Sequence, residues 1–377
     1  IGGPYRVTIS FVGYQSVAFT DINLLLGENI TRDAVLKDSQ ELEAVVIKAN
    51  VNRFDSNKTG AAQNFDSREI ASVPTINRSI FDVTKFTPQS MAIKGSGTSF
   101  GGTNNRYNSF QIDGIVSNDI FGLTDSGTNG GQTGANPVSL DAIEEIQVVV
   151  APFDVRQGGF TGGGINAITK SGTNHFKGSA YTYYNNEDFF GTTPGKDVKK
   201  RKKLTEQSSK VFGATIGGPI IKDKLFFFLA GEYSKNTYPS TYYPGYAGAN
   251  ITVDEARRIA DRYKALTGYD GGGYGGKDID TKSGSLNARI DWNISREHKL
   301  TVRYNFLDAS KDKYSSSANK YNFNGASWVQ VNRTHSLVAE LNSRLSDNVS
   351  NELRMGWTQV RDRRDVDNYL PYVIIQG

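Results

Sequence analysis

The chain has 377 residues, with 43 basic and 39 acidic side chains, a net charge of +4 and a mean hydropathy of −0.46. This balance argues against a nucleic-acid partner for the whole chain, and no segment approaches the roughly 20 apolar residues that a membrane-spanning helix requires. Cysteine is absent, which excludes disulfides, a thiolate nucleophile and cysteine-ligated zinc. Forty glycines, nineteen tyrosines and twenty phenylalanines favour strands and turns, so we expect a mainly β fold.

Residues 1–52 predict the end of a small β domain followed by a linker. Short alternating apolar runs within 1–38, interrupted at Gly13, suit the strands of a small sandwich. The linker, 39–52, is polar except for the run ELEAVVIKA at 41–49. An isolated strand-forming run of this kind can add an edge strand to a partner protein. The alternative is that it forms the first strand of the next domain.

Residues 53–173 predict a compact α+β domain with long loops. We expect strands at 109–115 and 143–150, and a short helix at 77–86 with Asn77 as its N-cap. The glycine-rich stretch 157–164 lacks the Gly-Lys-Ser/Thr of a phosphate-binding loop. We interpret these glycines as positions where the backbone turns and packs closely, before a last strand in GGGINAITKSGTN.

From residue 174 the pattern changes to long alternating strands. In SLNARIDWNI, 285–294, apolar residues occupy one face and polar residues the other without a break. Short and long connections alternate, as do the periplasmic turns and extracellular loops of outer-membrane barrels. We predict seven barrel strands, at 175–185, 209–221, 225–235, 284–294, 299–308, 333–345 and 351–361. Since bacterial barrels close with an even number of strands, we expect further strands beyond residue 377.

The long connections carry two features. Residues 251–266 predict a helix, because Thr252 and Glu255 have the spacing of a capping box. A basic cluster is expected at another loop tip and is either a solvated surface or a site for the phosphates of lipopolysaccharide. Its members are Lys196, Lys199, Lys200, Arg201, Lys202 and Lys203.

The candidate catalytic and metal-binding residues do not have the spacing that such sites require. The three histidines are too far apart for a metal-ligand pattern. Glu144 and Glu145 would face opposite sides of a strand, so they cannot flank one substrate. Asp278 and Asp280 begin a calcium-loop pattern that Lys282 interrupts. We therefore expect a chain that is not an enzyme and holds neither a metal nor a cofactor.

Several segments resemble TonB-dependent outer-membrane receptors, in particular the Oar-like branch found in Bacteroidetes and related bacteria. These segments are 41–49, 109–115, 140–174 and 212–233, of which 140–174 is the most specific. The start of the chain is similar to the end of a carboxypeptidase-regulatory-like domain. Where many family members carry Arg-Gly-Pro, this chain has Val150-Ala151-Pro152, so a role for that arginine is in doubt.

The resemblance implies a transmembrane antiparallel β-barrel of 22 strands, of which 174–377 are the first, with 53–173 as its α+β plug domain. It also implies location in the outer membrane of a Gram-negative bacterium and import of an external ligand, driven by the TonB-ExbB-ExbD complex. We also expect other outer-membrane or surface lipoprotein subunits as partners. The linker 39–52 would hold a TonB box at Glu43, Ala44, Val45, Val46, Ile47, Lys48 and Ala49.

Within such a barrel, the polar face of the strands would contact the plug through polar interactions that include water-mediated hydrogen bonds. The residues expected there are Arg289, Asp291, Arg303, Glu340 and Arg344. Two other functions stay open at this point. The chain could be a structural or accessory barrel subunit of an outer-membrane complex without TonB-driven transport, or a secreted β-rich adhesin.

Overall fold

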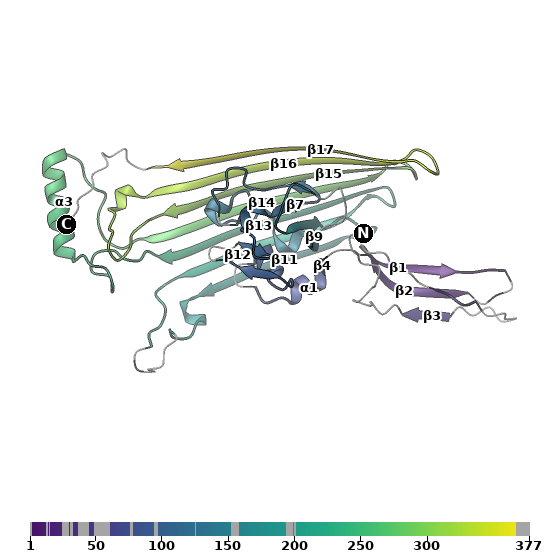
Figure 1. Cartoon of the computed structure of the whole chain (residues 1–377), viewed down its shortest axis with the longest axis horizontal. Helices are drawn as coiled ribbons and strands as arrows, with labels where there is room; N and C mark the ends of the chain where they lie inside the picture. The colour runs from purple at the N-terminus through teal and green to yellow at the C-terminus, as the bar shows by residue number, and fades with distance from the viewer. Residues whose placement is uncertain are drawn as a thin grey trace. The chain divides into compact units, whose positions relative to one another are not determined.

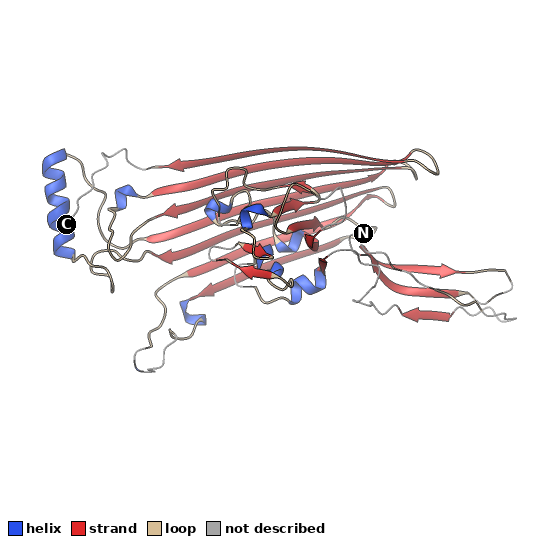
Figure 2. Ribbon diagram, viewed as in Figure 1, coloured by secondary structure: helices blue, strands red, loops and turns tan. Residues whose placement is uncertain are grey.

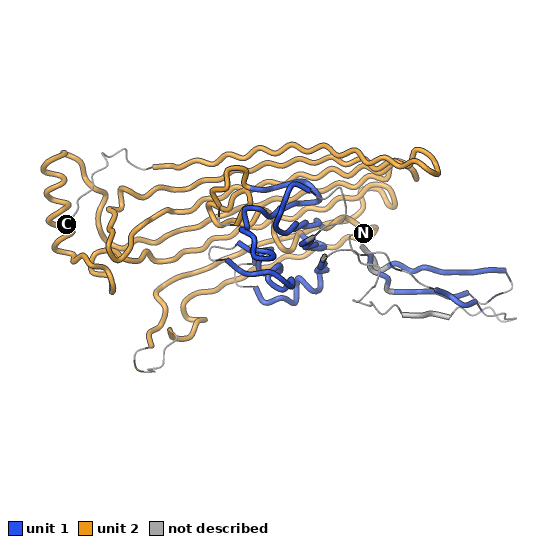
Figure 3. Tube along the Cα trace, viewed as in Figure 1, with its two compact units in different colours: residues 1–118, 143–169 blue, residues 119–142, 170–377 orange. Residues whose placement is uncertain are grey.

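The structure is a computed structural model, and it is mainly β (Figures 1 and 2). It describes residues 2–12, 14, 16–24, 30, 33–36, 45–48, 61–75, 78–93, 97–124, 126–151, 158–193, 199 and 201–366. The chain divides into two compact units, coloured separately in Figure 3. Unit 1 comprises 1–118 and 143–169, and unit 2 comprises 119–142 and 170–377. The segment 119–142, which we expected to belong with 53–173, therefore groups with the long strands.

Unit 1 begins with a small sheet in the order β1-β2-β3. Strands β1 (Gly2–Ile9) and β2 (Val17–Leu24) are antiparallel, as the alternating runs predicted. Strand β3 (Val45–Lys48) pairs in parallel with β2 and lies at the edge of this sheet. The described part of the linker run therefore forms a strand, and this strand pairs with another strand of the same chain.

The second sheet of unit 1 has the order β4-β9-β10-β7-β8. Alternating apolar residues of its central strands are buried, among them Ile146, Val148 and Ile165. A small separate pair is formed by β5 (Ser90–Ala92) and β6 (Thr98–Phe100). The strands of the sheet are β4 (Ala61–Asp66), β7 (Ser109–Ile112), β8 (Ile115–Val116), β9 (Ile143–Ala151) and β10 (Gly164–Thr169).

Three local details of unit 1 differ from the sequence-based expectations. The strand expected at 109–115 is a hairpin, because Asp113 and Gly114 both have positive φ, as a tight two-residue turn requires. Helix α2 (Ile80–Thr84) is shorter than expected, and its N-cap is Ser79, whose side chain accepts from the backbone N–H of Phe81; the expected cap, Asn77, lies outside the described residues. Helix α1 (Ser67–Ser72) was not expected; Asp66 caps it.

Unit 2 contains seven antiparallel strands, whose order in the sheet is their order in the described chain. All seven predicted strands are confirmed, and most extend further toward the long connections than expected. Their residues there are polar on both faces, so the alternation that marks a strand in the sequence is lost. The strands are β11 (Lys177–Asn186), β12 (Ser208–Ile221), β13 (Leu225–Pro239), β14 (Asp278–Asn293), β15 (His298–Lys313), β16 (Trp328–Arg344) and β17 (Ser350–Asp365).

The predicted helix in a long connection is confirmed as α3 (Val253–Thr267). The Thr252 side chain accepts from the Glu255 backbone N–H, and the Glu255 carboxylate accepts from the Thr252 backbone N–H, which completes the capping box. None of the helices in the described part of the chain is long and apolar enough to cross a membrane.

Candidate functional site

The two faces of the long strands have opposite character. On β14, Asn287 and Asp291 are 5% and 4% exposed, whereas Leu286 and Ile290 are 42% and 45% exposed. The cross-strand register carries these two faces from β11 to β17. We call the face with Asn287 the inner face and the face with Leu286 the outer face. A water-soluble sandwich buries its apolar face, so this inverted arrangement is that of a wall exposed to lipid.

The segment 119–142 is fixed to the inner face by hydrogen bonds. The Ser139 and Tyr181 hydroxyls both donate to the Glu232 carboxylate, at 3.2 and 2.9 Å, which joins the segment to β11 and β13. On β15, the Asn305 side-chain amide donates to the carbonyl of Pro137 at 2.9 Å. Three separate strands of the wall therefore hold this segment.

Close packing adds to these hydrogen bonds. Ala135 forms a buried apolar cluster with Leu307 and Ala309 of β15. Gly130 has a φ of +78°, and a Cβ added there would lie 2.6 Å from a methyl carbon of Leu307. Only glycine fits both the backbone angle and the space. The contact with Leu307 thus explains why glycine occupies position 130, in a segment whose glycines follow no periodic pattern.

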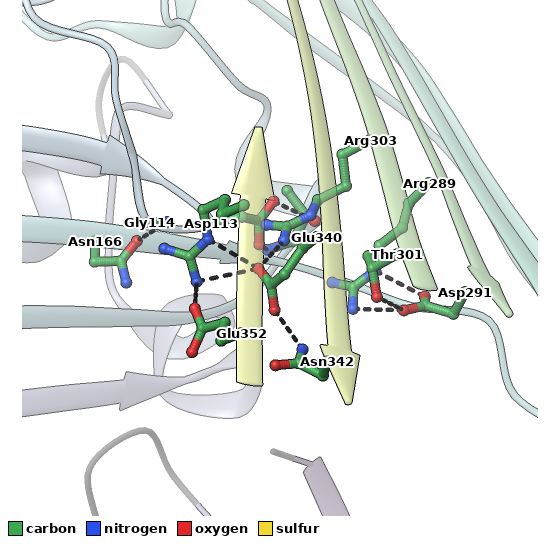
Figure 4. A network of polar contacts seen from close by, with 12 residues as sticks. Asp113, Gly114, Asn166, Arg289, Asp291, Thr301, Arg303, Glu340, Asn342 and Glu352 are labelled. Carbon is green, nitrogen blue, oxygen red and sulfur yellow. Dashed lines mark hydrogen bonds and ion pairs between the residues drawn. The ribbon is translucent and has the colours of Figure 1, made fainter. Parts of the chain in front are cut away.

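A ladder of charged side chains crosses the inner face from β14 to β17 (Figure 4). Arg289 donates twice to Asp291, at 2.7 and 2.9 Å, and the Thr301 hydroxyl donates to the same carboxylate at 2.9 Å. Arg303 and Arg354 both donate to Glu340, at 2.8 and 3.1 Å. Asn342 donates to the other Glu340 oxygen, and Glu352 accepts from Arg354. We call this set the inner charge ladder.

The inner charge ladder contains four of the five residues expected on the polar face. The register places Arg289 directly opposite Arg303, with Thr301 opposite both Asp291 and Glu340. Their common face is thus confirmed, and their contact with 53–173 stays a prediction. The fifth residue, Arg344, lies near a short turn and pairs with Asp347.

Unit 1 has its own buried polar contacts, also drawn in Figure 4. The Asp113 carboxylate accepts from the Thr169 backbone N–H at 2.9 Å and from its hydroxyl at 2.8 Å. The Asn166 side chain accepts from the Gly114 N–H at 3.0 Å. These bonds fix the tight turn between β7 and β8 against β10, so they organise the sheet.

An apolar loop tip lies within 119–142. The Asp119 carboxylate accepts from the backbone N–H groups of Phe121, Leu123 and Thr124, at 3.1, 2.6 and 2.8 Å. The side chains of Phe121 and Leu123 are nevertheless exposed, as is that of Ile120. One carboxylate therefore holds the loop in a fixed shape with its apolar side chains outward.

The two long connections 240–277 and 314–327 are joined to each other. The backbone N–H groups of Asn324 and Gly325 donate to the carbonyls of Gly273 and Gly271, at 3.0 and 2.9 Å. The Lys277 ammonium donates to the Ser327 hydroxyl at 2.9 Å. Burial raises the pKa of Tyr321, with Tyr314 and Tyr274 close by. These connections form a packed unit at one end of the strands.

The remaining predicted site residues are only partly within the described residues. Of the basic cluster, Lys196 and Lys200 lie outside them, whereas Lys203 pairs with Asp188 at 3.4 Å. Lys199, Arg201 and Lys202 belong to the same connection between β11 and β12. Of 43–49, only the backbone of Val45–Lys48 is described, as strand β3. No group of three or more potential metal ligands occurs in the part of the chain that was placed.

Comparisons with known proteins agree with this arrangement. Residues 168–250 match the family described as an outer membrane beta barrel domain. The chain is 27% identical over 259 residues to the TonB-dependent transporter Oar of Myxococcus xanthus, covering 63% of this chain and 23% of that protein. It is 38% identical over 102 residues to the probable TonB-dependent siderophore receptor PirA of Acinetobacter baumannii, covering 27% and 12%.

Among solved structures, the outer membrane transporter YddB from Escherichia coli is similar in fold, with a TM-score of 0.59 and 14% identity. That match covers 81% of this chain and 40% of the transporter. The chain thus spans less than half the length of each of these relatives. The comparisons confirm the resemblance to TonB-dependent outer-membrane receptors, the mainly β barrel fold and the outer-membrane localisation.

Proposed function

We propose that this outer-membrane β-barrel chain, which resembles the TonB-dependent transporters, captures a ligand from outside the cell and imports it by displacement of its plug. The observation that carries the proposal is the inverted wall, apolar outside and polar inside. A lipid-facing outer surface suits a barrel that spans the membrane. A hydrogen-bonded inner surface suits a passage that is filled by a polar plug and opened during transport.

The segment 119–142 supports ligand capture. It is fixed to the wall by Ser139 and by the carbonyl of Pro137, while Ile120, Phe121 and Leu123 extend from it. Because one carboxylate already orders this loop, a ligand that contacts it has less conformational entropy to remove. We propose that the loop tip contributes apolar contacts to the ligand site.

We propose that 43–49 acts as the TonB box. Its described part, β3, is an edge strand, with β2 on one side. An edge strand has backbone N–H and C=O groups available for pairing with another chain, which is the geometry of strand addition. Coupling to TonB-ExbB-ExbD would then begin at this edge, where the partner adds a strand.

We also keep the proposal that the basic cluster at 196–203 binds phosphates of lipopolysaccharide. The cluster belongs to the long connection between β11 and β12. Replacing all six basic residues with serine should lower the amount of lipopolysaccharide retained on purification. Unchanged retention would remove this proposal.

The test of TonB coupling is a pull-down of the chain by the periplasmic domain of TonB. Val45→Pro should abolish capture, because proline removes a backbone donor and disrupts strand pairing. Val12→Pro is the matched control, since Val12 lies in an exposed turn of the same sheet. Capture that ignores Val45→Pro, or no capture at all, defeats the transporter and leaves a structural or accessory barrel subunit. Recovery of the chain from the aqueous phase without detergent would instead favour an adhesin.

A further inference from the structure

Residues 170–176 connect the last strand of unit 1 to the first strand of the wall, and they belong to unit 2. Strand β10 ends at Thr169, and the first pair between β11 and β12 is Lys177 with Gly217. In the proposed function, a force that displaces 53–173 from its N-terminal side reaches this connection before it reaches β11. We call residues 170–176 the exit segment.

Asn174 joins the exit segment to the short turn between β12 and β13. Its side-chain amide donates to the Asp223 carboxylate at 2.5 Å, and its side-chain oxygen accepts from the Asp223 backbone N–H at 2.8 Å. Asp223 has a φ of +62°, a conformation that aspartate adopts more readily than most residues. The turn is also bonded to β14, because the Asn293 side chain donates to the Asp223 carbonyl at 3.0 Å. The exit segment is therefore attached to a point that is itself fixed to the sheet.

Glycines allow the exit segment to lie directly against the wall. A Cβ added to Gly172 would lie 2.8 Å from the carbonyl oxygen of Gly218 and 2.9 Å from the backbone nitrogen of Phe227, so no side chain fits there. Gly218 in turn leaves space for the ring of Phe176, whose centroid is 6.3 Å from that of the Phe227 ring. Gly172 and Phe176 thus pack on β12 and β13, on either side of Asn174 in the sequence.

The exit segment and the paired strands differ in how they resist a pulling force. Two strands that are pulled apart from one end open one pair at a time, so each pair carries the load alone. In the exit segment, the contacts of Gly172, Asn174 and Phe176 lie within five residues, and the load is shared among them. A force from the N-terminal side meets these shared contacts before the first pair of β11.

We propose that the exit segment is a mechanical stop, which confines force-driven unfolding to the residues before Gly172 and keeps β11 paired in the wall. The proposal rests on the proposed function, since it requires that a force act on the chain during transport. Without the stop, the same force would peel β11 from β12. Local unfolding of one part of a protein while another part stays folded requires such a boundary in stability. The stop lets 53–173 be displaced while the wall remains intact.

The test pulls the membrane-embedded chain by its N-terminus in single-molecule force spectroscopy. Unfolding of the unmodified protein should pause once the 171 residues before Gly172 are extended, at a contour length of about 600 Å. Asn174→Ala removes both hydrogen bonds to Asp223, so the pause at constant force should be about tenfold shorter. Asp223→Gly suits the positive φ and removes only the carboxylate, so it should shorten the pause about threefold.

The matched control is Asn293→Ala, because Asn293 bonds to the same turn from β14, a strand that the force has not yet reached. It should leave the length of the pause unchanged. Equal shortening in Asn174→Ala and Asn293→Ala would overturn the proposal, as would unfolding that proceeds past residue 172 without a pause. An unchanged pause in Asn174→Ala would also overturn it.

Gly172→Ala is a second, independent variant, because its Cβ would clash with the backbone of the wall. The pause should be lost in this variant, while the strand signal in circular dichroism checks that it is folded. The instrument applies the force directly, so these results do not depend on TonB. A failed TonB pull-down would defeat the transporter and leave the stop in place, whereas a missing pause would remove the stop and leave the transporter.

Discussion

The inner charge ladder lies on one face of the seven-stranded sheet, and three lysines that are directly opposite one another in the register, Lys210, Lys235 and Lys282, lie on the other face. On the inner face, Arg303 is only 8% exposed and donates to Glu340, which also accepts from Arg354 and Asn342. On the outer face, Lys235 and Lys282 share the Asp280 carboxylate, whereas Lys210 lies over the Tyr184 ring. Both regions place like charges directly opposite each other in the register, Arg289 with Arg303 and Lys210 with Lys235.

The difference follows from the surroundings of each face. A buried guanidinium must find its counterion within the protein, because water no longer solvates it. A lysine at the edge of an apolar band keeps its ammonium among water and lipid headgroups, so its counterion can come from outside the protein. Internal pairing therefore indicates a structural role for the charges of the inner face, whereas the charges of the outer face need no such close pairing.

The largest effect is expected from breaking the inner charge ladder at Glu340. Glu340→Ala removes the carboxylate that two arginines share and leaves Arg303 without this acid in a buried position. We expect a loss of about 3 kcal/mol in the free energy of unfolding, measured by denaturant titration in detergent. Glu352→Ala is the control, since its side chain is 45% exposed and its loss should cost less than about 1 kcal/mol. An equal loss of unfolding free energy in Glu340→Ala and Glu352→Ala would mean that the inner charge ladder does not stabilise the fold.

A moderate effect is expected at Asp280, whose carboxylate pairs with both Lys235 and Lys282. Asp280→Asn leaves these two lysines without this counterion, so the chain should unfold more readily in detergent at low salt. The loss of unfolding free energy should shrink at high salt, which screens exposed charges, and denaturant titration at two salt concentrations measures it. A loss that does not depend on salt would contradict a stabilising role for these two ion pairs.

The smallest effect is expected at Glu255, a paired carboxylate outside the wall. The Thr252 backbone N–H holds the pKa of the Glu255 carboxyl below its usual range, and the Thr252 hydroxyl adds to this. A lowered pKa means that the carboxylate stabilises the start of α3 above its ordinary pKa of about 4.3, and that this support is lost as the pH falls through the lowered value. Amide exchange at residues 253–255 should accelerate there beyond its intrinsic pH dependence. In Glu255→Gln the added dependence should disappear; its persistence would argue against this cap.

The sequence predicts the wall well because membrane strands display their environment in alternate residues. Leu286, Ile290 and Trp292 mark the outer face, and the polar residues between them mark the inner face. The same logic fails at the ends of the strands. Residues 278–284 and 310–313 are polar or small on both sides, so no alternation reports that pairing continues.

The attachment of 119–142 to the wall could not be predicted. Its contacts join Ser139 to Tyr181 and Glu232, residues that are 42 and 93 positions away in the sequence. A single serine, tyrosine or glutamate carries no spacing signal, and the glycines near Gly130 resemble those of any loop. By contrast, Asp113-Gly114 is a recognised hairpin signal, and it lies within 109–115, where the apolar pattern predicts a single strand.

The order of the strands in unit 2 has a consequence for how this wall forms and varies. Each of β11 to β17 pairs with its neighbour in the sequence. Pairing can therefore begin at a short turn and proceed along the two strands that it joins, without a distant part of the chain. These strand pairs are β12 with β13, β14 with β15 and β16 with β17. Low sequence separation of this kind speeds folding. The long connections add little to the free-energy cost of forming the wall, because doubling the length of a flexible loop adds only about 0.6 kcal/mol of closure entropy. The long connections can therefore change in length and sequence while the register of the wall is kept.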